Sequence, residues 1–187
     1  SPRSVCQKLG SPFGRRHTTA SSSRLTGRRL LPHRLLDAHF PESLHAYILD
    51  AVALELDLYA HPQRRKRDPG FRARILTAYE HRCAVCGFDV RIGTNPLGIE
   101  AAHIKWHQAG GPDEERNGLC LCSLHHKMLD MGAFTVSSEF LLLVSEQAHG
   151  RGGFDEWLMR FHAQRLRSPV RSEYEPAGEF LDWHEKQ

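Results

Sequence analysis

Two short cysteine and histidine motifs constrain the fold most, because a metal held between them would join distant parts of the chain. The first is Cys83-x-x-Cys86 and the second is Cys122-x-x-His125, which repeats the two-residue spacing. Three thiolates and one imidazole form a common tetrahedral ligand set for Zn²⁺. Since the protein fills all four positions, such a zinc would be structural. We therefore expect Zn²⁺ to join these two motifs.

Cys120 is the alternative to Cys122 as the third thiolate. The two residues are two positions apart, so in an extended chain both side chains would point the same way. The spacing favours Cys122, which leaves Cys120 as a small buried residue. The fifth cysteine, Cys6, lies far from both motifs. An odd number of cysteines without a secretory signal argues against a disulfide framework.

The composition is ordinary for a chain that buries a core, with 40% hydrophobic and 25% charged residues among 187. No stretch reaches the ~18 consecutive apolar residues of a membrane span. Residues 1–36 hold eight basic and no acidic residues, so we expect a disordered basic tail or linker. The sequence begins without Met or an apolar leader, which suggests an internal fragment. We expect one domain over residues 37–187 and a cytoplasmic location.

Hydrophobic periodicity predicts a mixture of helices and short strands. A helix should begin near Pro41, and a second should begin at Asp68–Pro69 and end near His81. Gly132 has the position of a C-terminal helix cap. The further expected elements are strands at Phe88–Ile92 and Ile99–Lys105, a helix at Ser123–Met131, a hairpin of Ala133–Val136 with Phe140–Val144, and helices at Asp155–His162 and Ala177–Glu185.

Three polar residues lie close to the second cysteine motif in the sequence. His103 and Asn117 precede it, and His126 follows it directly. They lie within the stretches AAHIKW and NGLCLCSLHHK, which follow CAVCG and surround the loop GGPDE. In this arrangement the sequence resembles the HNH endonuclease family over residues 82–144. The resemblance implies an α+β fold with a zinc-stabilised ββα-metal (HNH, His-Me finger) core and flanking helices. The helices at residues 150–187 would form a C-terminal cap.

The resemblance also implies roles for these residues. His103 would be the general base that takes a proton from the attacking water, a role suited to an imidazole whose ordinary pKa is ~6.5. Asn117 would hold the loop or orient His103. His126 would bind a catalytic Mg²⁺ or Mn²⁺ that stabilises the scissile phosphate. The family also places zinc ligands at Cys83, Cys86, Cys122 and His125.

One position departs from the family pattern. Many members have Asp immediately before the base histidine as a second metal ligand, and this chain has Ala102. Asp130, one helical turn after His126, could supply the missing carboxylate. Glu100, on the same strand face as Ala102, is the other candidate. The sequence leaves this choice open.

The flanking stretches LLDAHFPESLHAYILDAV and GGFDEWLMRFH resemble the C-terminal nuclease part of bacterial modification-dependent restriction endonucleases, which act on methylated or phosphorothioated DNA. The resemblance implies double-stranded DNA as the partner, an upstream domain that reads the modification, and no membrane association. It is also compatible with a homodimer. A basic cluster beside the motif would contact phosphate. The expected nucleic-acid-binding residues are Arg64, Arg65, Lys66, Arg67, Arg72 and Lys105.

Two other functions fit parts of this pattern. The main alternative is a non-catalytic zinc-binding module for nucleic acid, in which His103 is only structural. A zinc-stabilised protein-interaction domain is the second. Cleavage of DNA that is lost in a His103→Ala variant would separate the enzyme from both, and steep salt dependence of DNA affinity would exclude the second.

Overall fold

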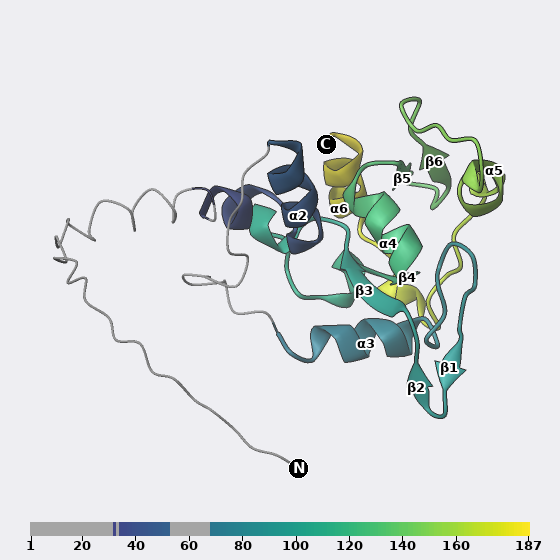
Figure 1. Cartoon of the computed structure of the whole chain (residues 1–187). Coiled ribbons are helices and arrows are strands. Elements are labelled where there is room, and N and C mark those ends of the chain that lie inside the picture. The colour runs from purple at the N-terminus through teal and green to yellow at the C-terminus, as the bar shows by residue number, and fades with distance from the viewer. Residues whose placement is uncertain (1–31, 33, 53–67) are drawn as a thin grey trace, which may run out of the picture.

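A computed structural model describes residue 32 and residues 34–52 and 68–187 of the chain (Figure 1). The predicted phosphate contacts Arg64 to Arg67 and almost all of the predicted N-terminal tail lie outside these residues. The chain is helical at residues 34–39, so helical structure begins before the predicted domain start at residue 37. No helix of the described part is long and apolar enough to cross a membrane.

The described residues form short helices and three two-stranded antiparallel sheets. The α-helices are α2 (Glu42–Ala51), α3 (Phe71–Ala78), α4 (Ser123–Asp130), α5 (Phe154–Trp157) and α6 (Gly178–Glu185). The strands are β1 (Arg91–Ile92), β2 (Asn95–Pro96), β3 (Ile99–His103), β4 (Gly118–Cys122), β5 (Phe134–Val136) and β6 (Leu142–Val144). Single 3₁₀ turns occur at His107–Ala109, Glu115–Asn117, Met159–Phe161 and Ser172–Tyr174.

The centre of the fold is the β3–β4 pair with a helix on each side (Figure 1). The strands pair from Ile99 opposite Cys122 to His103 opposite Gly118. Helix α3 packs on both strands, and α4, which follows β4 directly, also contacts both. All five residues of β4 are buried, because neither face of this strand meets solvent.

Helix α3 packs closely on this hairpin through its apolar residues. Phe71, Ile75, Leu76 and Ala78 are all buried, as the predicted apolar face requires. The helix begins at Phe71, later than the predicted start at Asp68–Pro69. Asp68 lies in the turn before it. The Asp68 carboxylate accepts a hydrogen bond from the backbone N–H of Gly70 (2.8 Å) and so caps the turn that leads into α3.

The C-terminal residues return to the centre of the fold. The backbone N–H of Val170 donates to the carbonyl of Ala78, and that of Arg167 donates to Ala84 in the first cysteine motif. Helix α6 packs against β5, with Phe180 and Leu181 buried. This segment therefore packs against the core.

The predicted fold class is confirmed: the chain combines helices with small sheets around a hairpin followed by a helix. Helix α4 ends as predicted, with Gly132 in the left-handed region (φ 68°). The hairpin β5–β6 and the helix α6 also lie where the sequence places them. Strand β4 was not predicted, because a strand buried on both faces lacks the alternation that identifies a half-buried strand.

Candidate active site and metal centre

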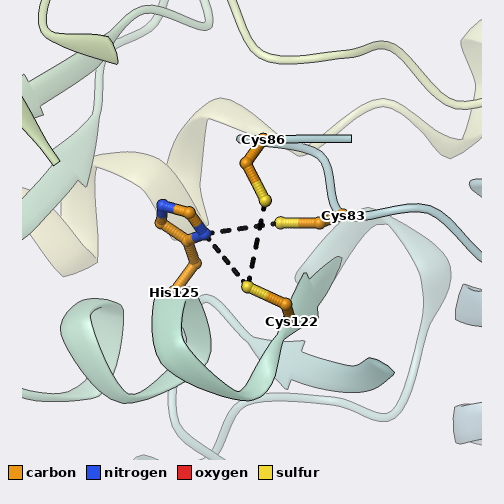
Figure 2. Close-up of side chains that lie close together, drawn as sticks. All are labelled: Cys83, Cys86, Cys122 and His125. Atoms are coloured by element: carbon orange, nitrogen blue, oxygen red, sulfur yellow. Dashed lines mark hydrogen bonds between the residues drawn. The ribbon is translucent and has the colours of Figure 1, made fainter. Parts of the chain in front are cut away.

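Four side chains from the two cysteine motifs converge on one point, as Figure 2 shows. The ligand atoms of Cys83, Cys86, Cys122 and His125 all lie within 4.8 Å of one another. His125 Nδ1 lies 3.1 Å from the Cys122 sulfur and 3.7 Å from the Cys83 sulfur, and the Cys86 and Cys122 sulfurs are 4.0 Å apart. Ligands at ~2.0–2.3 Å from a tetrahedral Zn²⁺ would be separated by about 3.5–3.8 Å. The group can therefore hold a structural zinc.

Local backbone structure brings these residues together. The first motif forms a tight turn in which the N–H of Gly87 donates to the Cys83 carbonyl (2.9 Å), and Gly87 has a positive φ of 75°. Cys122 is the last residue of β4, and His125 lies in the first turn of α4. The N–H of Ala84 donates to the carbonyl of Cys120 (2.7 Å), which fastens the turn to β4.

The far side of the His125 ring is fixed by a carbonyl group. His125 Nε2 lies 2.9 Å from the carbonyl oxygen of Trp157 and is positioned to donate to it. This bond places the proton on Nε2 and leaves Nδ1 to face the three sulfurs, as is usual for a metal-bound histidine. Phe134 and Phe161 contact the ring edge-on and exclude water from it.

The thiols and the imidazole shift the pKa values of one another. Hydrogen bonds with Cys122 and Cys86 lower the pKa of Cys83, whereas the contacts with Cys83 and Cys86 raise the pKa of Cys122. Burial alone would lower the pKa of His125, but the neighbouring sulfurs raise it to about 9. A divalent metal would displace protons from this group on binding, so its affinity would depend on pH.

Cys120, the alternative ligand, lies outside this group. It is fully buried in the middle of β4, where it pairs with Ala101. Burial raises the pKa of its thiol to about 12, so Cys120 stays protonated and behaves as a small apolar residue. The structure therefore brings Cys122, and not Cys120, to the other three ligands.

His103 is the last residue of β3, and its side chain contacts both α3 and the loop that follows β3. Its imidazole stacks on the ring of Phe71 in α3, with centroids 4.1 Å apart. Its Nε2 lies 2.8 Å from Oδ1 of Asp113. Asp113 was missed by the sequence reasoning; it lies in the loop GGPDE, and only its place between His103 and Asn117 could have suggested it.

Asn117 is fully buried and fastens the loop that follows β3. Its Oδ1 accepts from the N–H of Lys105 (2.8 Å), and its Nδ2 donates to the carbonyls of Lys105 (3.0 Å) and Pro112 (2.9 Å). In addition, the N–H of Ile104 donates to the Asn117 carbonyl (3.0 Å). The side chain thus closes the loop at both of its ends, immediately beside His103 and Asp113.

His126, in α4, lies between two carboxylates. Its Nδ1 is 2.6 Å from Oε2 of Glu100, and its Nε2 is 3.5 Å from Oδ2 of Asp130. The Glu100 side chain is 44% exposed, whereas that of Asp130 is 4% exposed. Although burial opposes the shift, hydrogen bonds from Ser123 and His126 lower the pKa of Glu100. Both acidic residues named from the sequence therefore lie beside His126.

The two clusters lie on opposite sides of β3. His103 contacts α3 through Phe71, and Glu100 contacts α4 through His126. Residues three apart on a strand point to opposite faces, so this arrangement follows from the pleat of β3. The sheet between α3 and α4 thus carries the imidazole of His103 on one side and the carboxylate–imidazole pair on the other.

Two of the residues predicted to contact phosphate, Arg72 and Lys105, lie in the described part of the chain. Arg72 donates from Nη2 to the carbonyl of Ile99 (2.9 Å), which attaches the start of α3 to β3. Lys105 directly follows the β3 end, and its backbone is held by Asn117. Lys105 therefore lies near His103, whereas the guanidinium of Arg72 lies at the opposite end of β3.

Comparison with known proteins finds similarity over part of this chain. Residues 83–137 match the family model described as HNH endonuclease, and this match confirms the predicted family resemblance and enzyme class. A search of curated proteins finds no match. Among solved structures, the chain is similar to a protein described as "Modification dependent TagI restriction endonuclease", with a TM-score of 0.48 and 22% identity over 74% of this chain and 42% of that chain. The chain thus spans less than half the length of that protein.

Proposed function

We propose that this chain is a metal-dependent DNA endonuclease that hydrolyses phosphodiester bonds with His103 as general base. The observation that carries the proposal is the placement of His103 and Glu100 on one short hairpin, and of His126 on the helix that follows it, inside the segment that matches the HNH family. Because the two clusters lie on opposite faces of β3, one phosphate could meet both only if the DNA backbone passed over the end of this strand beside His103.

In this reaction His103 would accept a proton from the attacking water. Its ring is held by Phe71 on one face, and Asn117 fixes the backbone that follows it at Lys105. A general base must be held within hydrogen-bonding distance of the proton it removes, so this rigid setting suits the role.

We assign the catalytic metal to His126 and Glu100. A divalent ion bound there would stabilise the charge on the phosphate and on the leaving 3′ oxygen. Glu100 is the exposed carboxylate and can be reached by DNA, whereas Asp130 is buried. Asp130 therefore suits the role of a hydrogen-bonding partner that orients the His126 ring, as carboxylates often do for metal-bound histidines. Carboxylate oxygen and imidazole nitrogen are suitable ligands for Mg²⁺ or Mn²⁺.

We further propose that the chain is the cleavage part of a bacterial, cytoplasmic, modification-dependent restriction enzyme. The support is the sequence resemblance of the stretches on both sides of the HNH segment. On this proposal residues 37–187 form the nuclease domain, a domain elsewhere in the protein reads the DNA modification, and zinc at the Cys₃His group is structural. Two copies, each with one site, would be needed to cut both strands at once.

Nicking of a supercoiled plasmid with Mg²⁺ or Mn²⁺ tests the proposal. We expect cleavage by the wild type, and a loss of about 10²–10⁴-fold in His103→Ala. His149→Ala, which removes an exposed histidine outside both clusters, is the matched control and should cleave normally. Equal nicking by wild type and His103→Ala would show that the chain is the non-catalytic zinc module instead. The full-length protein on modified and unmodified DNA tests the restriction role.

A further inference from the structure

The loop between β3 and β4 presents the carboxylate of Asp113 to the imidazole of His103. The Asp113 Oδ1 and His103 Nε2 atoms are 2.8 Å apart, and both side chains are 13% exposed. A bond between a carboxylate and an imidazole in such a half-closed site is shorter and stronger than one between neutral groups. The distance and the low exposure therefore indicate a stable hydrogen bond between the two side chains.

Asp113 is itself held on its other oxygen. Oδ2 accepts a hydrogen bond from the backbone N–H of Asp68, at 2.6 Å, and His107 Nε2 lies 3.8 Å from the same oxygen. Although burial opposes the shift, the bonds from Asp68 and His103 lower the pKa of Asp113. Each carboxylate oxygen thus has its own donor, which fixes the orientation of the group.

The backbone of the loop is equally constrained. Arg74 donates from Nη2 to the carbonyl of Asp113 (2.8 Å) and also bonds Asp68 (2.7 Å) and Glu115 (2.8 Å). Asn117 holds the carbonyl of Pro112, the residue before Asp113. Gly111 has no room for a side chain, because a Cβ there would lie 1.9 Å from the carbonyl oxygen of Lys105. The position of the carboxylate is therefore built into the loop.

We propose that Asp113 is a positioning residue for His103, an inference that rests on the nuclease function proposed above. By accepting the Nε2 proton, Asp113 selects the tautomer whose lone pair is on Nδ1, so Nδ1 is the atom that takes the proton from water. The imidazolium formed in that step is then stabilised by the adjacent carboxylate. Because Asp113 is bonded to Asp68, the orientation of the base also depends on the backbone just before α3.

Asp113→Asn tests this role with almost no change in shape. The N–H of Asp68 needs an acceptor, so it should keep the amide oxygen and leave the NH₂ group facing His103 Nε2. That arrangement favours the opposite tautomer, with the proton on Nδ1 and no base for water. Glu114→Gln is the matched control, because it removes the charge of the neighbouring, exposed carboxylate. Asp113→Ala, which removes both hydrogen bonds, is the second variant.

Two readouts are needed. Long-range ¹H–¹⁵N NMR, with the His103 signals assigned through His103→Ala, reports the tautomer without requiring activity. We expect the Nε2–H form in the wild type and in Glu114→Gln, and a shift to Nδ1–H in Asp113→Asn. In nicking assays we expect kcat to fall by about 10²-fold or more in Asp113→Asn, by analogy with the loss of a tautomer-fixing carboxylate, with KM unchanged.

The outcomes separate this inference from the proposed function. An unchanged tautomer in Asp113→Asn, or a kcat within about 2-fold of the wild type, would overturn the role of Asp113 while leaving the nuclease intact. If the wild type cleaves no DNA, the proposed function fails and the catalytic role of Asp113 fails with it. In that case the NMR spectra still show whether the Asp113–His103 bond sets the tautomer.

Discussion

Phe71 lies flat against the imidazole of His103, with the ring centroids 4.1 Å apart and the planes inclined by 16°. Phe71 is the first residue of α3 and precedes the matched HNH segment, so the site depends on a helix outside that segment. The close packing needs Gly118, which pairs with His103 across the hairpin. A Cβ at Gly118 would lie 2.2 Å from Cδ1 of Ile75 and 3.1 Å from Cζ of Phe71. One glycine thus allows α3 to support His103.

Gly118→Ala should therefore displace α3 and lower the free energy of unfolding by about 1–3 kcal/mol, the usual cost of overpacking. Its backbone is extended (φ −133°, ψ 145°), so only the lack of space opposes a side chain. Gly178→Ala is the control, because nothing lies within 4 Å of a Cβ there. Urea unfolding measures both. Equal stability of the two variants would show that α3 adjusts without cost.

Zinc removal should unfold the core. We expect about one zinc per chain by elemental analysis, and loss of both zinc and the cooperative melt in Cys83→Ser, because structural zinc contributes directly to folding. Cys120→Ala is the matched control: it removes a buried cysteine outside the ligand group and should keep its zinc. A circular-dichroism melt that is unchanged in Cys83→Ser would contradict the structural role.

Glu100 and Asp130 should respond differently to neutralisation. Glu100→Gln removes the proposed metal ligand, so Mn²⁺ affinity measured by calorimetry should fall by well over 10-fold. Asp130→Asn removes the carboxylate beside His126 Nε2 and should cost about 10-fold, at the lower end for residues that orient a metal ligand. The opposite order would assign the ion to Asp130. Zinc content should stay unchanged in both variants, which separates the two metal sites.

The zinc ligands were the most predictable part of the site, because their spacing within each motif is short and their residue types have few other uses together. The choice between Cys120 and Cys122 depended on where β4 ends. In the structure Cys122 ends that strand and precedes α4, which brings it beside His125. The spacing of the cysteines alone does not predict where a strand ends and a helix begins.

The carboxylates were harder to place from the sequence. Glu100 and Asp130 were both named as partners of His126, but their different exposure results from packing in three dimensions. Asp113 was missed because a loop residue carries no periodic signal. Its place beside His103 is set by contacts from Asp68 and Arg74, which are 45 and 39 positions away in the chain.

Asn117→Asp should disrupt the loop although the two side chains have the same shape. Asn117 Nδ2 donates to two carbonyl oxygens in a fully buried position, and an aspartate oxygen there would face both of them without a proton. We expect a loss of about 1–3 kcal/mol for each acceptor left unpaired, together with loss of nicking. Asn95→Asp, at an exposed position of β2, should be neutral in thermal melts. Similar melting temperatures of both variants would show that the Asn117 hydrogen bonds to the loop do not stabilise the fold.

His184 should make folding stability fall as the pH drops. It is buried, with Nε2 placed to donate to the Leu129 carbonyl (3.2 Å) and Nδ1 placed to accept from the Thr135 hydroxyl (2.9 Å). Burial lowers the pKa of His184 below its ordinary value of 6.5.

The unfolded chain then binds a proton at this residue more readily than the folded chain, so acid favours unfolding. The contribution of neutral His184 to folding stability is complete above pH ~6.5, the ordinary pKa of histidine. It is lost as the pH falls through the lower pKa of the folded state. His184→Gln cannot titrate, so its melting temperature should fall less between pH 7.5 and pH 5 than that of the wild type. Zinc release in acid affects both proteins alike, so the difference between their curves isolates His184. Parallel curves would mean that His184 binds protons equally in both states.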